Sequence, residues 1–236
     1  QDYRVQFGSP DPKGATVKAM WCHTAQDIVN PGPDYQTGYG SARTQAAIDF
    51  MRTGNFIEES VDNAGSYNLV VVVQPGDPEM KVTLAWDDFP GTPNVNPNLV
   101  NDLDLVVTSP SGTRFYPWTL NPANPGADAV QNAENHLDNI EQVFVNNPEP
   151  GGWLVEVRGT AVPQGPQTFS LCASPFLVNC SDMGIVQLNA NSYLCEDSLS
   201  IKAIDCGLNT SDMVVDTVSV NVASDTDPVG INVVLT

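Results

Sequence analysis

The chain has 236 residues, with 9 Lys and Arg against 28 Asp and Glu, so its formal net charge is −19. This excess excludes nucleic-acid binding by phosphate neutralisation, which needs clustered cations, and it argues against docking on anionic membranes. Charged residues make up 16% of the chain and hydrophobic residues 41%, a composition too apolar for a disordered acidic tail. We therefore expect one large or two to three small globular domains.

The charge is unevenly distributed along the chain. Residues 1–55 hold five acids and five bases and so carry no net charge, and the whole acidic excess lies in residues 56–236. A shift this sharp indicates a domain boundary near Asn55.

Two short helices are predicted before this boundary. Apolar residues at helical spacing predict the first over Ala15–Ala25, before the stop signal Pro31-Gly32-Pro33. The second is predicted over Ser41–Arg52, with Ser41 as its candidate N-cap. Two helices of this length cannot bury a core alone, so this hairpin needs a partner surface.

After Phe56 the pattern changes to β-branched and aromatic runs that are separated by turn-forming Pro and Gly clusters. These runs predict strands over Tyr67–Gln74, Lys81–Trp86, Leu99–Thr108, Asn139–Asn146, Trp153–Arg158 and Thr168–Ala173. Because no helical pattern intervenes, we expect an antiparallel jelly-roll sandwich or barrel. The long polar stretch Tyr116–Leu137 interrupts it, and stretches of that length are usually functional or ion-held loops.

Alternating residues near Ile201, Val220 and Val233 predict further half-buried strands, which we interpret as an immunoglobulin-like module. The chain is thus expected to be mainly β, with a short helical part at 1–55, a jelly-roll domain at 56–175 and an immunoglobulin-like sandwich module at 176–236. With only about 60 residues, the last is either truncated or supported by disulfides.

The chain has no Met start, no basic n-region and no long apolar run, so we expect no membrane span and interpret it as a processed or excised piece of something longer. Four of its five cysteines lie in the last 65 residues. This predicts an oxidising, extracellular setting with one or two disulfides and one free thiol.

Bases for nucleophilic catalysis are scarce, because His23 and His136 are the only histidines. We interpret His23 as a satisfied surface or interdomain residue and His136 as an ordinary loop residue. The sequence contains no Gly-x-Ser-x-Gly, His-Glu-x-x-His or Gly-x-x-x-x-Gly-Lys motif. We therefore expect no enzyme site and no catalytic residue in this chain itself.

The string Asn101-Asp-Leu-Asp-Leu105 is the best candidate site. Strand alternation places Asp102 and Asp104 on one face, where their carboxylates repel unless a cation lies between them. Oxygen ligands suit Ca²⁺, which takes six to eight of them. Asp87, Asp88, Asn135, Asp138, Asn139 and Glu141 are the residues that could complete such a site. The alternative interpretation is a solvated acidic face.

Two parts of the chain resemble a known family. Ala15-Thr-Val-Lys-Ala-Met-Trp-Cys-His-Thr-Ala25, followed by Gly32–Gly40 and Ala46-Ala47, resembles the final two helices of subtilisin-like serine protease domains, although Ser41-Ala-Arg43 departs from the family pattern. Four later strings are similar to the β-barrel domain that follows the catalytic domain in one secreted branch of that family. They are Leu84–Gly91, Leu99–Thr108, Asn139–Phe144 and Val162–Leu171. The tail from Gly184 resembles repeat modules appended to large secreted proteases.

This resemblance implies a parent that cleaves peptide bonds with an Asp/His/Ser triad. The family's Gly-Thr-Ser motif is absent here, so no triad residue carries over. Jelly-roll domains of such proteases hold structural Ca²⁺, which supports Asp102 and Asp104 as ligands, together with Asn135 and Asp138.

We therefore expect the non-catalytic C-terminal part of a secreted subtilisin-like endopeptidase, whose partner is its own upstream catalytic domain and whose β domains stabilise the parent or present substrate. The alternative is a processed extracellular fragment that acts as an adhesion or self-assembling, filament-like module. Such a fragment would form homo-oligomers through exposed strand edges.

Overall fold

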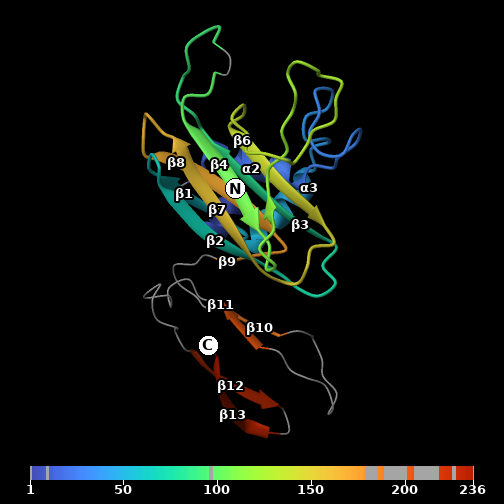
Figure 1. Ribbon diagram of the computed structural model, residues 1–236, viewed down its shortest axis with the longest axis vertical. Coiled ribbons are helices and arrows are strands. Elements are labelled where there is room, and N and C mark those ends of the chain that lie inside the picture. Colours follow the sequence, from blue (N-terminus) through green and yellow to red (C-terminus); the bar gives the residue numbers. More distant parts are fainter. Residues whose placement is uncertain are drawn as a thin grey trace. The chain divides into compact units, whose positions relative to one another are not determined.

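The structure is a computed structural model of the chain (Figure 1). It describes residues 2–8, 11–95, 98–178, 185–188, 201–204, 218–224 and 227–235. The chain divides into two compact units, Gln1–Val178 and Asn179–Thr236. The three-part division with boundaries near residues 55 and 175 stays a prediction.

The described residues of the first unit form three helices followed by nine strands. The helices are α1 (Asp2–Phe7), α2 (Gly14–Thr24) and α3 (Thr44–Thr53). The strands are β1 (Phe56–Val61), β2 (Ser66–Val73), β3 (Glu79–Trp86), β4 (Asp102–Thr108), β5 (Arg114–Phe115), β6 (Ile140–Asn146), β7 (Gly151–Ala161), β8 (Gln167–Ser174) and β9 (Phe176–Val178).

The nine strands form two antiparallel sheets. One has the order β1-β8-β3-β6 and the other the order β5-β4-β7-β2-β9. This is the strand order of a jelly roll, with β9 added at one edge. The predicted mainly β fold is confirmed, and each of the six expected strands is present within a few residues of its predicted bounds.

The main core lies between the two sheets and is built from alternate residues of their strands. Leu103, Leu105 and Val107 of β4 belong to it, as expected from the alternation, and they are completely buried. Trp86 and Trp153 are its largest members, and each indole N–H donates a hydrogen bond to a backbone carbonyl. Complete burial of an aliphatic side chain such as Leu103 or Leu105 stabilises the fold by about 1.5–3 kcal/mol.

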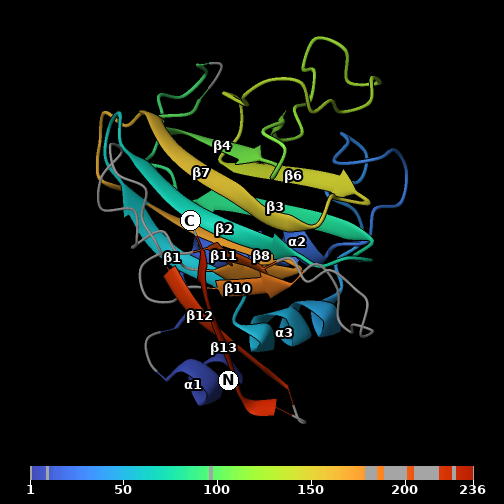
Figure 2. The same cartoon turned by 60° about the horizontal axis from the view of Figure 1, so that its bottom comes forward.

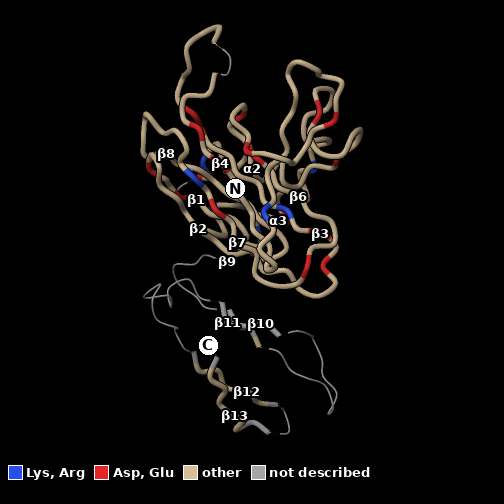
Figure 3. Tube along the Cα trace, viewed as in Figure 1, with Lys and Arg blue, Asp and Glu red and all other residues tan. Residues whose placement is uncertain are grey.

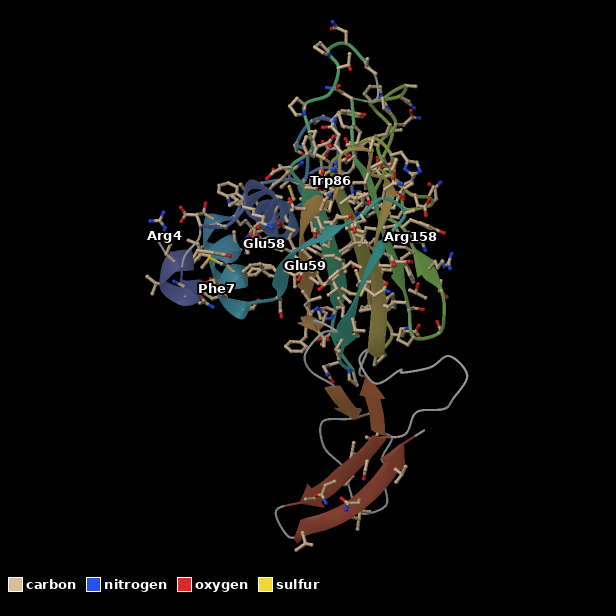
Figure 4. All side chains as sticks on the ribbon, turned by 90° about the vertical axis from the view of Figure 1, so that its left-hand side faces the viewer. Arg4, Phe7, Glu58, Glu59, Trp86 and Arg158 are labelled. Carbon is tan, nitrogen blue, oxygen red and sulfur yellow. The ribbon has the colours of Figure 1, made fainter. Side chains whose placement is uncertain are left out.

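The helices pack on the outer side of the four-stranded sheet (Figures 2 and 4). Ala19 and Met20 of α2 and Met51 of α3 form a second apolar cluster with Ala85, Ile140 and Cys172 of the strands. The hairpin therefore has the partner surface that its length requires.

One detail of the helix prediction is wrong. The residue that precedes α3 is Arg43, without a side-chain cap, and Ser41 does not cap the helix. The backbone of Ser41 instead pairs with that of Gln26, which ties the segment before α3 to the segment after α2.

In the second unit, β10 (Ile185–Leu188) pairs with β11 (Ile201–Ile204), and β12 (Val218–Ser224) pairs with β13 (Asp227–Leu235), both antiparallel. Val220 and Val222 are half-buried while Ser219 and Asn221 are exposed, as the alternation predicts. The immunoglobulin-like assignment stays a prediction.

Two further expectations concern the whole chain. Cys22 and Cys172 are free thiols, and Cys180, Cys195 and Cys206 lie outside the described residues, so the expected disulfides stay a prediction. Over the described ranges, no helix combines the length and the apolar character that crossing a bilayer requires.

Candidate metal centre

The candidate site is built on the face of β4 that points away from the core. Asp102 and Asp104 alternate with the core residues of this strand. A register shift between β4 and β7 leaves Thr160 outside the strand pairing, and its hydroxyl donates a hydrogen bond to Asp104 Oδ2. Asp104 is completely buried, whereas the Asp102 side chain is 18% exposed.

The polar loop between β5 and β6 lies against this face. His136 places its Nδ1 2.8 Å from Asp102 Oδ2 and 3.4 Å from Asp104 Oδ1. Arg158 of β7, on the opposite side of the sandwich from the helices (Figure 4), donates to Glu134 of the same loop at 3.1 Å. One ligand atom each from Asp102, Asp104 and His136 lies within 4.8 Å of the other two.

Glu141 of the other sheet brings a third carboxylate to the edge of β4 beside this cluster. β5 pairs only with Val107 and Thr108, so the backbone N–H of Leu105 is left at the open edge of β4, where it donates to Glu141 Oε2 at 2.7 Å. Glu141 is completely buried. Burial raises the pKa of Glu141 well above its usual range, and the charges of Asp104 and Asp102 raise it further.

Three carboxylate oxygens on β4 and at its edge are buried without a hydrogen-bond partner among the described residues: Asp102 Oδ1, Asp104 Oδ1 and Glu141 Oε1. Bare carboxylate oxygens in a buried place cost several kcal/mol unless a proton or a cation compensates them. Burial also raises the pKa of Asp102 and of Asp104. The donors are mostly carboxylate oxygens, so they fit a hard cation such as Ca²⁺ better than a transition metal.

The other two residues that we expected as ligands lie nearby but are engaged with each other. Asn135 Nδ2 donates to Asp138 Oδ2 and to the carbonyl of Trp118, both at 3.3 Å, and Asn135 Oδ1 accepts the N–H of Leu137 at 3.0 Å. Asn135 therefore stabilises the conformation of the loop through these hydrogen bonds. The charge of Asp138 contributes to the raised pKa of Glu141.

The other acidic candidates have structural roles. Asp88 accepts the backbone N–H groups of Val100 and Asn101 and so shapes the entry to β4. Asp87 Oδ2 accepts the N–H of Ala15 at the start of α2. His136 was not predicted as a site residue, and its position between Asn135 and Asp138 in an acidic loop is the signal that could have found it.

A serine–histidine contact occurs elsewhere, between α2 and the sheet. His23 Nε2 lies 3.1 Å from Ser174 Oγ, and His23 Nδ1 lies 3.0 Å from Thr83 Oγ1. A general base of this kind needs a carboxylate behind the imidazole and a pKa near the working pH. Here the second partner is a hydroxyl, and burial lowers the pKa of His23 to about 3. The contact is therefore a hydrogen-bonded link between helix and sheet.

Comparisons with known proteins find similarity to proteins that are named as serine proteases. No family model matches the chain. It is 26% identical over 174 residues to the serine protease/ABC transporter B family protein tagD of Dictyostelium discoideum. The alignment covers 66% of this chain and 9% of tagD. It is 24% identical over 169 residues to tagA of the same organism, covering 68% of this chain and 10% of tagA. The chain thus spans about a tenth of the length of these relatives.

Two solved structures show weaker likenesses. The mitogen of Yersinia pseudotuberculosis gives a TM-score of 0.27 at 12% identity, covering 52% of this chain and 92% of that one. A serine protease of Aeromonas sobria gives a TM-score of 0.24 at 11% identity, and the match covers 72% of this chain and 41% of the protease chain. At TM-scores this low, neither likeness establishes a shared fold.

Proposed function

We propose that this chain is the non-catalytic C-terminal part of a secreted, subtilisin-like serine endopeptidase, in which the jelly roll supports the catalytic domain. The sequence similarity to proteins named as serine proteases supports a protease relation. The narrower assignment rests on the helix and strand strings that resemble the subtilisin-like family.

The distribution of exposed apolar side chains carries this proposal. Of the fifteen large hydrophobic side chains exposed in the described residues, seven lie between residues 5 and 35: Val5, Phe7, Val17, Trp21, Ile28, Val29 and Tyr35. Val17 and Trp21 are one turn apart on the outer face of α2, while Ala19 and Met20 are buried against the sheet. Of these residues, Val5 and Phe7 lie on α1 and Val17 and Trp21 on α2, so these two helices carry apolar side chains on their exposed surface as well, which suits them to lie between two bodies. We assign the outer one to the upstream catalytic domain.

We further propose that Asp102, Asp104 and Glu141 hold a structural Ca²⁺. The three bare buried oxygens support it, and Asp138 is a further candidate ligand, with Asn135 holding the loop beside it. Bound Ca²⁺ would neutralise the carboxylates and tie β4, β6 and the polar loop together, so it would stabilise the folded state by mass action.

Active-site labelling tests the proposed division of labour. We expect a fluorophosphonate probe to label the full-length parent and to leave the purified chain unlabelled. Removal of residues 56–178 from the parent should shorten the half-life of its peptidase activity on heating. Labelling of this chain, or an unchanged half-life after the deletion, would contradict the proposal.

One observation favours self-assembly as a second candidate function. Among the described residues, β9 is an edge strand whose one partner is β2, and its Phe176 is 52% exposed. Exposed edges of this kind invite pairing between chains. Light scattering separates the two functions, because a strictly monomeric chain up to high concentration would rule out assembly.

A further inference from the structure

The first unit contains a cavity of about 550 Å³ between the helical segment and the sandwich. The end of α2, the segment before α3, the outer ends of β3 and β6 and the polar loop all line it. Its aromatic lining is Tyr39, Phe50, Trp118 and Phe144, and its charged lining is Asp27, Arg43, Glu79 and Lys81. This volume lies within the usual range for sites that bind small molecules.

Specific contacts hold the walls of this cavity in place. Gln131 of the polar loop donates to the carbonyl of Phe144 at 3.1 Å and accepts its N–H at 2.9 Å. The N–H of Trp118 donates to the carbonyl of Gln142 at 2.9 Å. Gly32 packs so closely on Trp118 that a Cβ would lie 2.7 Å from the indole. The aromatic walls are therefore formed before any ligand arrives, which lowers the entropic cost of binding.

The two basic residues of the cavity have no carboxylate ion-pair partner among the described residues. Lys81 Nζ donates to the carbonyl of His23 at 3.2 Å and lies 5.3 Å from the centroid of the Phe144 ring. Within the described residues neither Lys81 nor Arg43 forms an ion pair. Arg4, Lys13, Arg52 and Arg158 do form ion pairs, whereas Lys18 and Arg114 also form none within the described residues, and basic residues are few in this acidic chain (Figure 3).

The two acids of the lining bring its formal charge to zero, but both are exposed and neither forms an ion pair with Lys81 or Arg43 within the described residues. Asp27 Oδ2 accepts the N–H of Gly32 at 2.7 Å and so belongs to the loop. Glu79 is exposed at the start of β3. Burial lowers the pKa of the Lys81 ammonium group, while the charges of these two acids favour its protonated form. A half-buried ammonium group with neutral contacts gains from an anionic ligand.

We propose that this cavity binds a small carboxylate that carries an aromatic group, such as the C-terminal phenylalanine of a peptide. Lys81 and Arg43 would receive the carboxylate, and the aromatic walls would receive the ring. This ligand site rests on the cavity alone and does not depend on the proposed relation to proteases.

Isothermal titration calorimetry with N-acetylphenylalanine and its amide tests this assignment. We expect the acid to bind and the amide to bind roughly tenfold or more weakly, because the charge-assisted hydrogen bonds are lost. N-acetylalanine, which lacks the ring, should also bind more weakly than N-acetylphenylalanine. Equal binding of acid and amide, or no heat from the acid at millimolar concentration, would overturn the proposal.

Variants then locate the site. Arg43→Gln and Lys81→Met should each weaken binding of N-acetylphenylalanine about tenfold. Arg43 is exposed, so Arg43→Gln should fold and keeps the test valid if Lys81→Met does not fold. Arg114→Gln removes an exposed cation on β5, outside the cavity, and is the matched control. Loss of binding in Arg114→Gln equal to that in Arg43→Gln would show a non-specific charge effect and would refute the site.

Discussion

Replacement of His23 by Gln tests whether the helix–sheet link depends on a buried, neutral imidazole. His23 is 3% exposed and is held between Thr83 and Ser174. Burial lowers its pKa to about 3, against about 6.5 in an unfolded chain. Below pH 6.5 the unfolded state therefore binds a proton that the folded state refuses, and stability is lost as the pH falls from 6.5 toward 3.

The size of this loss is set by the two pKa values. A pH of 4 is about 2.5 units below the pKa of the imidazole in the unfolded chain. At about 1.36 kcal/mol per unit, this costs the folded state about 3 kcal/mol of stability. For a unit of 178 residues this is a shift of roughly 6–12 °C in melting temperature. His23→Gln lacks the titrating group, so it should lose stability at pH 7 through poorer packing but should lose about 3 kcal/mol less than the wild type between pH 7 and pH 4.

Urea unfolding followed by tryptophan fluorescence at pH 4, 5, 6 and 7 measures this difference. The carboxyl groups of the candidate metal centre titrate in both proteins and cancel in the comparison. His23→Asn serves as a second variant of different shape and should show the same reduced pH dependence. Parallel stability curves for wild type and both variants would refute a buried neutral His23.

Three further predictions concern the scaffold. At Gly40, φ is +103° and a Cβ would lie 2.1 Å from the carbonyl oxygen of Gln26, so Gly40→Ala should destabilise the fold by more than about 2 kcal/mol. Gly38 has open space around it, so Gly38→Ala should cost about 1 kcal/mol. Equal melting temperatures for the two variants would exclude the close contact at Gly40. Asp87→Asn removes the negative charge at the start of α2 and should cost about 0.3–1 kcal/mol in low salt and less in 1 M NaCl, and a loss that salt does not change would count against a helix-dipole effect. Leu103→Ala in the core should cost about 2–5 kcal/mol in urea unfolding, while Leu154→Ala, at 42% exposure, should cost under about 1 kcal/mol, and similar losses would contradict the sandwich core.

Local patterns predict most of the strands because each is a β-branched and aromatic run that turn-forming residues bound. β7 alternates between buried and more accessible residues, whereas β2, β3 and β4 each contain at least five consecutive buried residues. β1 was missed because Glu58 and Glu59 interrupt its apolar pattern, and Glu58 is needed there to accept hydrogen bonds from Lys13 and Thr16 at the start of α2. β5 and β9 have two and three residues, which is too short for a period to be recognised.

The candidate site was predictable only where it is local. Asp102 and Asp104 are two residues apart on one strand, so alternation places them together. His136 reaches them because the polar loop lies against this face of β4, and Glu141, which the sequence analysis named only as one of six possible additional ligands, reaches the backbone of Leu105 at the β4 edge. These contacts are non-local, and spacing does not encode them. His23 was interpreted as a satisfied surface or interdomain residue. It is satisfied by hydrogen bonds but buried, because the outer face of the sheet offers hydroxyl groups to the helix.

Heat inactivation of the full-length parent, with and without Ca²⁺, most directly tests the proposed supporting role of this chain. At a free Ca²⁺ concentration one hundred times the dissociation constant, the site should add about 2.7 kcal/mol of stability, or roughly 5–11 °C in melting temperature. We expect Ca²⁺ to protect the wild-type peptidase, and EDTA or Asp104→Asn to remove that protection while kcat/KM at low temperature stays unchanged. Equal inactivation with and without Ca²⁺, or an Asp104→Asn parent that Ca²⁺ still protects fully, would contradict a supporting domain held by calcium.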